Sequence, residues 1–375
     1  MRKVSMAIIL IFAMMSSPVA CADDQLVASP QLPATFIKYA ASSKLGHPGI
    51  LVIDSKDKTE LFNHSADAAH VPASVFKLVS TFTALNFLNP DRTFSTALFT
   101  TEKKGTVILL GSRDPWLTSN LVSAQKNEQV YLPALVMKGK TSSRYLTIKY
   151  SGLFSKDIAN LALYLRKHGV QPSFKEVTPE VAVSQSVNLI AEDQSPPVSE
   201  MVKFAILWSD NQLADRLVRE AARHESHPSD SAGIQKVIEQ ALAQHSISTK
   251  DLNVIDGAGL DRENRVTPRT IVEILTVVRS NQQFKAIYDG LPIAGESGTL
   301  KKRFSTTGTN AIGLVHAKTG WINNVVSLAG YVTVGKDEYV FAIIADGVPG
   351  SFKYRNRARE TIDAMLGTIA TPLNN

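Results

Sequence analysis

Apolar and polar positions alternate in short segments at both ends of the chain, as is typical of half-buried strands. Near the N-terminus two such segments flank a polar turn at residues 55–58, which predicts a β-hairpin. Toward the C-terminus three further segments predict strands, and residues 352–366 predict a closing helix. The expected strands are residues 49–54, 59–63, 312–319, 325–333 and 339–345.

Longer apolar segments in the middle of the chain predict helices. Residues 75–88 are apolar on nearly every side, so we expect a helix buried within a domain. A proline pair at 196–197 opens a helix that ends at Trp208, and residues 213–223 predict another. Strands at both ends with helices between them indicate an α+β fold. We expect an antiparallel sheet built from both chain ends, covered by helices, with a helical subdomain.

The pattern changes between residues 90 and 189, where short apolar pieces alternate with polar turns and a single clear helical pattern covers residues 155–167. We interpret residues 90–189 as a smaller inserted domain, with residues 182–193 as the linker that returns from it. The main domain would then comprise residues 23–89 and 190–375.

The first 22 residues have the composition of a secretory signal peptide. Arg2 and Lys3 precede an apolar run at residues 6–15, and small residues surround Cys21. We therefore expect export to the periplasm or cell envelope, with no transmembrane segment in the mature chain, because no later segment reaches about 18 consecutive apolar residues. Cys21 could instead carry a lipid at the mature N-terminus, but the proline and valine just before it fit a lipoprotein signal poorly.

Composition narrows the function classes. The chain of 375 residues is 44% hydrophobic and 20% charged, and its net charge of +6 comes from scattered basic residues, a pattern that argues against nucleic acid as a partner. Its single cysteine excludes a disulfide framework and argues against structural zinc. No His-Glu-x-x-His string and no glycine-rich phosphate loop occurs, so we expect neither a metal nor a cofactor.

Three short strings carry the candidate chemistry. In chain order they are Ser74-Val75-Phe76-Lys77, Ser209-Asp210-Asn211 and Lys318-Thr319-Gly320. Together they are the parts of a serine acyl-transferase that uses lysine as its base. Single matches are common, because Ser-x-x-Lys recurs at residues 55–58 and 123–126 and Ser-x-Asn at 186–188. The prediction therefore depends on the order and spacing of the three strings and on the apolar sequence around Ser74. The two other Ser-x-x-Lys matches are expected to be solvated.

Each string supports a distinct step. Ser74 and Lys77 are one helical turn apart, and an apolar helix would lower the pKa of the lysine so that it can accept the serine proton. Ser209 and Asn211 interrupt two helices and would point into a cleft, although an asparagine there could simply cap a helix. Lys318 lies near a strand end, where it would meet a carboxylate, and a following glycine lets the backbone approach closely.

With these strings placed, the chain resembles the penicillin-binding proteins and serine β-lactamases. Within that superfamily it is most similar to the low-molecular-mass D-alanyl-D-alanine carboxypeptidase/endopeptidase family, which carries insertions between the first two motifs. Further stretches that carry the resemblance are residues 195–200, 256–260, 291–303 and 327–332.

The resemblance implies that Ser74 attacks the penultimate D-alanine carbonyl of a peptidoglycan stem peptide or cross-link, and that β-lactams trap the same serine. Lys77 would be the base and Ser209 the proton relay. The substrate-binding residues would be Asn211 for an amide, Lys318 and Thr319 for the terminal carboxylate, Gly320 for close backbone approach, and Trp321, whose backbone N–H would complete the oxyanion hole with that of Ser74.

Two departures from the family pattern change the expectation. Trp321 stands where the family has threonine or serine, so a hydroxyl is lost and a large ring is expected to crowd the site. The insert of about a hundred residues is also short for the family. A β-lactamase remains an alternative, but residues 241–253 lack the glutamate such an enzyme uses as a second base. A non-catalytic peptidoglycan-binding or penicillin-sensing protein is the other alternative.

Overall fold

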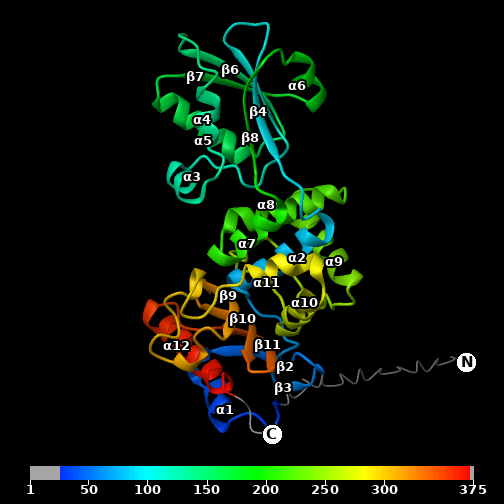
Figure 1. Cartoon of the computed structure of the whole chain (residues 1–375), viewed down its shortest axis with the longest axis vertical. Helices are drawn as coiled ribbons and strands as arrows, with labels where there is room; N and C mark the ends of the chain where they lie inside the picture. The colour runs from blue at the N-terminus through cyan, green and yellow to red at the C-terminus, as the bar shows by residue number, and fades with distance from the viewer. Residues whose placement is uncertain (1–25, 372–375) are drawn as a thin grey trace, which may run out of the picture.

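The computed structural model describes residues 26–371 and contains two β-sheets joined by a layer of helices (Figure 1). The predicted signal peptide and Cys21 lie outside the described residues. The α+β class expected from the sequence is confirmed, because antiparallel strands from both chain ends form one sheet.

The larger sheet has six antiparallel strands in the order β1-β3-β2-β11-β10-β9. N-terminal and C-terminal strands meet where β2 pairs with β11, so that Ile50 lies opposite Ile343. Five of the six strands coincide with the expected apolar segments, with ends shifted by a few residues. Their bounds are β1 (Val27–Ala28), β2 (His47–Asp54), β3 (Glu60–His64), β9 (Val315–Ile322), β10 (Val325–Val334) and β11 (Asp337–Asp346).

Helices cover both faces of this sheet. On one face α1 and α12 pack together, and the apolar cluster beneath them includes Phe36, Phe62 and Phe341. On the other face lies the helical layer built around α2, which is buried on nearly every side, as its apolar sequence predicts. The helices are α1 (Ala34–Ala40), η1 (Ser43–Leu45), η2 (Ala73–Phe76), α2 (Lys77–Phe87), α7 (Val198–Trp208), α8 (Asn211–His224), α9 (Ser231–Gln244), α10 (Pro268–Ser280), η3 (Gln282–Phe284), α11 (Lys285–Asp289), η4 (Gly298–Leu300), η5 (Thr309–Ala311) and α12 (Phe352–Ile369).

The smaller sheet stands at the opposite end of the molecule, beyond α7 and α8 (Figure 1). Its order is β7-β6-β5-β4-β8, with parallel pairs among β5, β6 and β7 and antiparallel pairs between β4 and its two neighbours. Its elements are β4 (Ser95–Thr100), β5 (Thr106–Gly111), α3 (Leu121–Asn127), α4 (Leu132–Met137), β6 (Tyr145–Ser151), α5 (Ser155–Lys167), β7 (Gln171–Glu176), α6 (Pro179–Gln185) and β8 (Leu189–Gln194).

The interpretation of residues 182–193 as a linker is wrong. These residues finish α6 and then form β8, which pairs with β4 through contacts such as Ala97 opposite Glu192. β8 ends in three consecutive polar residues, Glu192, Asp193 and Gln194, and none of its residues is buried, which is why the segment resembles a linker in sequence. The smaller sheet therefore continues past residue 189 to Gln194.

Buried ion pairs attach the smaller sheet's segment to α8. Arg216 Nη2 donates to Asp157 Oδ2 at 2.6 Å and Arg216 Nη1 donates to the Leu117 carbonyl at 2.7 Å, with both charged side chains almost fully buried. Arg113, whose side chain is 26% exposed, pairs with the fully buried Glu220. Because α8 begins at Asn211, these contacts couple the 95–194 segment to one of the three predicted motifs.

Candidate active site

Ser74 and Lys77 lie within hydrogen-bond distance at the start of the buried helix α2. Ser74 is in the 3₁₀ turn η2, where side chains three residues apart eclipse each other, and Lys77 is the first residue of α2. Lys77 Nζ donates to Ser74 Oγ at 2.9 Å. It also donates to Asn211 Oδ1 at 2.7 Å and to the Ala258 carbonyl at 2.8 Å, so three acceptors fix the nitrogen beside the serine.

The surroundings of Lys77 lower its pKa. Its side chain is 0% exposed, and burial lowers its pKa from 10.5 to about 8, against the carboxylates of Asp256, Asp210 and Asp215, which raise it. A pKa near 8 leaves roughly one lysine in ten as the free amine at pH 7. Lys77 can therefore act as a general base toward Ser74 at neutral pH.

The backbone around Ser74 is held in a strained conformation. Ala73, just before it, has a φ of +51°, which costs a residue with a β-carbon about 1 kcal/mol or more. Two glycines allow other segments to approach this turn. A β-carbon at Gly259 would lie 2.0 Å from the Ala73 carbonyl oxygen, and one at Gly320 would lie 3.0 Å from that of Pro72.

The second string forms the bend between α7 and α8. Ser209 ends α7 with a φ of +58°, a left-handed conformation that reverses the chain. Asp210 caps α8 by accepting from the Leu213 N–H at 2.9 Å. The capping role weighed for Asn211 thus belongs to its neighbour, and the Asn211 side chain instead accepts from Lys77.

The third string lies on β9, the edge strand of the large sheet. Lys318 is fully buried and donates to Ser209 Oγ at 2.8 Å and to the Thr319 carbonyl at 2.8 Å. Burial, and then the positive charge of Lys77, lowers the pKa of Lys318 well below its usual range. Ser74, Lys77 and Asn211 thus form one hydrogen-bonded group and Ser209 and Lys318 another, and the two groups interact electrostatically.

The free edge of β9 offers backbone N–H groups to the site. The N–H of Ala317 points away from β10, because it donates to the Pro292 carbonyl at 2.9 Å. Backbone direction alternates along a strand, so the N–H of Thr319 and of Trp321 point to the same edge. The Thr319 hydroxyl lies 2.8 Å from that of Thr299, which adds a second hydroxyl that the sequence strings do not indicate.

The expectation that the Trp321 ring crowds the site is wrong. Val315 and Ala317 belong to the apolar cluster under α12, and Trp321 packs against that cluster. Its ring lies 5.9 Å from that of Phe352, and the Arg355 guanidinium stacks on it at 4.8 Å. The ring thus packs against α12, on the opposite side of β9 from the turn that carries Ser74.

A loop at residues 256–261, which the motif strings did not include, supplies the third partner of Lys77. Asp256 Oδ1 accepts from the N–H of Ala258 and of Gly259 at 2.7 Å, and its Oδ2 accepts from that of Asp261 at 2.6 Å. Asp215 Oδ1, on α8, accepts from the Gly257 N–H at 2.9 Å. These carboxylates hold the Ala258 carbonyl toward Lys77. The only sequence signal was the resemblance over residues 256–260.

A cavity of about 610 Å³ opens beside Asn211 and Ala258. Phe154, Ser155 and Lys156 of the smaller sheet's segment form one wall, and Arg219 lies on another. The cavity adjoins the Lys77 group through Asn211 and Ala258, and its volume is in the range of ligand sites. The inserted segment therefore contributes directly to the cleft.

The other motif matches do not form sites. Ser55 Oγ donates to Glu338 of β11, and Lys58 Nζ donates to the Ser55 carbonyl within the hairpin turn. In α3 the Ser123 hydroxyl donates to Gln129. Across residues 26–371 no group of three or more His, Cys, Asp or Glu side chains is arranged to hold a metal ion. No helix in the same part of the chain is long and apolar enough to span a bilayer.

Comparisons with known proteins identify the family of the chain. The family model described as D-Ala-D-Ala carboxypeptidase 3 (S13) matches residues 38–178 and 151–369. The carboxypeptidase DacB of Mycolicibacterium smegmatis is 26% identical over 415 aligned positions, which cover 94% of this chain and 88% of that protein. The penicillin-sensitive carboxypeptidase A of Dictyostelium discoideum is 36% identical over 170 residues, 41% of this chain but 31% of that protein. The chain thus aligns with about a third of this second relative's length.

Among solved structures, penicillin binding protein 4 (dacB) of Haemophilus influenzae superposes with a TM-score of 0.65. The superposition covers 90% of this chain and 96% of that one, at 17% identity. The likeness establishes a shared fold across both sheets.

Proposed function

Since the chain belongs to the D-Ala-D-Ala carboxypeptidase 3 (S13) family, we propose that it is a serine hydrolase that cleaves D-alanyl-D-alanine bonds in peptidoglycan stem peptides or cross-links. β-Lactams would acylate the same serine. The observation that carries the proposal is the 2.9 Å hydrogen bond between Ser74 Oγ and the buried Lys77 Nζ. A buried lysine with a pKa near 8 is the base that such a serine needs.

In the acylation step Ser74 Oγ attacks the carbonyl carbon of the penultimate D-alanine and Lys77 takes the hydroxyl proton. The N–H groups of Ser74 and Trp321 stabilise the resulting oxyanion. When the tetrahedral intermediate collapses, the C–N bond breaks and the leaving amine takes a proton, relayed through Ser209. The products are an acyl-Ser74 ester and a free amine.

Binding contacts orient the substrate for this attack. The terminal carboxylate meets the Lys318 ammonium and the Thr319 hydroxyl, and a peptide amide meets Asn211. An anionic carboxylate beside Lys318 raises the pKa of that lysine again, so the ammonium form is favoured when substrate is bound. Gly320 leaves room for the substrate backbone along the β9 edge. Water then hydrolyses the ester, with Lys77 as base, and restores Ser74.

The test is the intact mass of the purified protein after incubation with a penicillin, with Ser74→Ala as the matched variant. A lasting one-to-one adduct that Ser74→Ala abolishes would support the proposal. Rapid consumption of penicillin with no lasting adduct would indicate a β-lactamase. The absence of both adduct and consumption would refute acylation at Ser74 and favour a binding protein. Release of D-alanine from a stem pentapeptide, compared with cleavage of a cross-linked dimer, separates carboxypeptidase from endopeptidase action.

We also propose that the chain is exported to the cell envelope, where this substrate occurs, and that the sheets mark two domains. Arg2, Lys3 and the apolar run after them support export. The second sheet, built wholly within residues 95–194, supports an inserted domain. Cell fractionation with and without residues 1–22 tests export, and limited proteolysis tests the domain division.

A further inference from the structure

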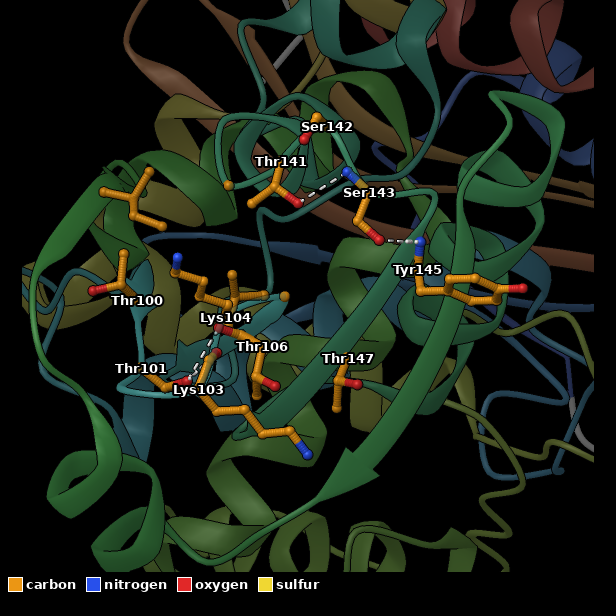
Figure 2. A pocket seen from close by; sticks show the side chains of 14 residues that line it. Thr100, Thr101, Lys103, Lys104, Thr106, Thr141, Ser142, Ser143, Tyr145 and Thr147 are labelled. Carbon is orange, nitrogen blue, oxygen red and sulfur yellow. Dashed lines mark hydrogen bonds between the residues drawn. The ribbon is translucent and has the colours of Figure 1, made fainter.

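A cavity of about 650 Å³ lies at the far end of the smaller sheet, away from the catalytic cleft (Figures 1 and 2). The turn between β4 and β5 forms one side of it, and the loop that leads into β6 forms the other. Val107 and Ile190 supply apolar surface in its wall. Its volume is in the range of small-ligand sites.

Hydroxyl groups dominate the lining. Thr106 on β5 and Thr147 on β6 are directly paired across the parallel strands, so their side chains lie next to each other on one face of the sheet (Figure 2). Within residues 26–371 neither hydroxyl has a protein hydrogen-bond partner, and the same holds for Ser142 in the opposite loop. These three hydroxyls are available to a ligand.

The loops that frame the cavity are held by their own hydrogen bonds. Thr101 Oγ1 donates to the carbonyls of Lys103 and Thr106 at 3.1 and 3.2 Å. Across the cavity the Ser143 N–H donates to Thr141 Oγ1, and the Tyr145 N–H donates to Ser143 Oγ at 3.0 Å. Figure 2 shows these bonds bracketing the opening. The cavity is thus formed before any ligand binds.

All charge in the lining is positive. Lys103 and Lys104 both line the cavity, and no Asp or Glu of the described chain does. Neither ammonium is paired with a carboxylate within residues 26–371. Glu102, their neighbour, lines the adjoining hollow together with Lys149. An anionic group entering the cavity would meet two unpaired cations with no competing carboxylate in its wall.

We infer that this cavity is a binding site for a carboxylate-bearing saccharide, the chemistry of a glycan strand with its stem peptide. The lysines would take a carboxylate, the free hydroxyls of Thr106, Thr147 and Ser142 would bond to sugar hydroxyl or amide groups, and the apolar wall would meet sugar C–H faces. A simple inorganic anion would use the lysines and leave the hydroxyls without partners.

This inference rests on the proposed function, which makes a glycan–peptide polymer the substrate. When a polymer is bound in this cavity, its effective concentration at the catalytic cleft is raised, so it binds there more tightly than a free fragment does. The site should therefore matter for sacculi and long strands, and have no effect on short peptides that reach the cleft alone.

The first experiment titrates a disaccharide-tripeptide, which lacks D-alanyl-D-alanine, into full-length Ser74→Ala protein by calorimetry. Lys103→Glu combined with Lys104→Glu should weaken binding by about tenfold or more. Lys167→Glu with Lys175→Glu makes the same charge change on exposed lysines of the same segment, outside the cavity, and should change binding less than twofold. Thr106→Val with Thr147→Val, which keeps the shape and all charges, should weaken binding severalfold.

Several outcomes would overturn the inference. These are no measurable binding, equal affinity in all variants, or equal loss in the two lysine pairs, which would indicate a general charge effect. Displacement by an equal concentration of inorganic phosphate would indicate a plain anion site. In the otherwise wild-type chain the cavity variants should slow release from sacculi but not from a free pentapeptide. If the wild-type chain cleaves neither the pentapeptide nor a cross-linked dimer, the proposed function fails, and the calorimetric result still decides the cavity.

Discussion

Replacing Lys77 by methionine should remove the base. It should also remove the free-energy penalty of burying the lysine ammonium in the folded chain at neutral pH. Burial lowers the pKa of Lys77 from 10.5 to about 8. One pKa unit corresponds to about 1.4 kcal/mol, so holding the ammonium in the folded chain costs roughly 3 kcal/mol at pH 7. Methionine has a similar length and no charge. The cost identifies Lys77 as a residue kept for its chemistry rather than for stability.

The pH dependence of this effect has a definite sign. Below about pH 8 both folded and unfolded chains hold the Lys77 proton, and the full cost is present. Between about pH 8 and 10.5 the unfolded chain binds more protons than the folded one, so wild-type stability rises with pH. The cost falls to roughly 1 kcal/mol at pH 10, and the stability difference between Lys77→Met and wild type should change by roughly 2 kcal/mol.

Urea unfolding of both proteins at pH 7 and pH 10 measures this change. As an ammonium at pH 7 Lys77 donates three hydrogen bonds, and as a free amine at pH 10 it can donate at most two, a difference that the lowered pKa already includes. The loss of the lysine side chain's packing contacts is the same at both pH values and cancels in the comparison. Lys167→Met, at an exposed lysine, is the matched control and should show no such change. The reasoning is refuted if the difference in free energy of unfolding between Lys77→Met and wild type is the same at both pH values. It is also refuted if the variant becomes more stable relative to wild type as the pH rises.

Three further outcomes follow from the site. The rate of penicillin acylation should rise about fifty-fold between pH 6 and pH 8, because Lys77 with a pKa of about 8 loses its proton over that range. Intact-mass time courses measure this rate, and a rate that does not change with pH would exclude Lys77 as the base. Asp256→Asn removes a negative charge that raises the Lys77 pKa, so the midpoint of that profile should move below pH 8, and an unmoved midpoint would contradict the electrostatic role of Asp256. Arg216→Ala should lower the free energy of unfolding by about 3 kcal/mol, because it leaves Asp157 buried without its partner. The double variant Arg216→Met with Asp157→Leu, which removes both charges, should lower it clearly less in urea unfolding. An equal loss of stability in the two variants would argue against an uncompensated charge as the cause.

Much of the fold could be predicted because its determinants are local. Strand and helix periods depend on neighbouring residues, and they predicted α5 at Ser155–Lys167 and strands such as β10 to within a few residues. The hydrogen bond between Ser74 and Lys77 is equally local, because three residues along a tight helical turn bring the two side chains together whatever surrounds them. The order of the three strings then indicated a shared site.

What only the tertiary structure decided involves partners distant in sequence. β8 has the polarity of a linker and becomes a strand because β4 is there to pair with it. The Trp321 ring avoids the cleft because it packs against Phe352 of α12 and the apolar cluster beneath that helix. The third acceptor of Lys77 is the carbonyl of Ala258, a group that every residue possesses, so residue identity does not reveal it. A sequence specifies side chains and their local spacing. Backbone groups enter a site only when the packing of separate segments brings them there.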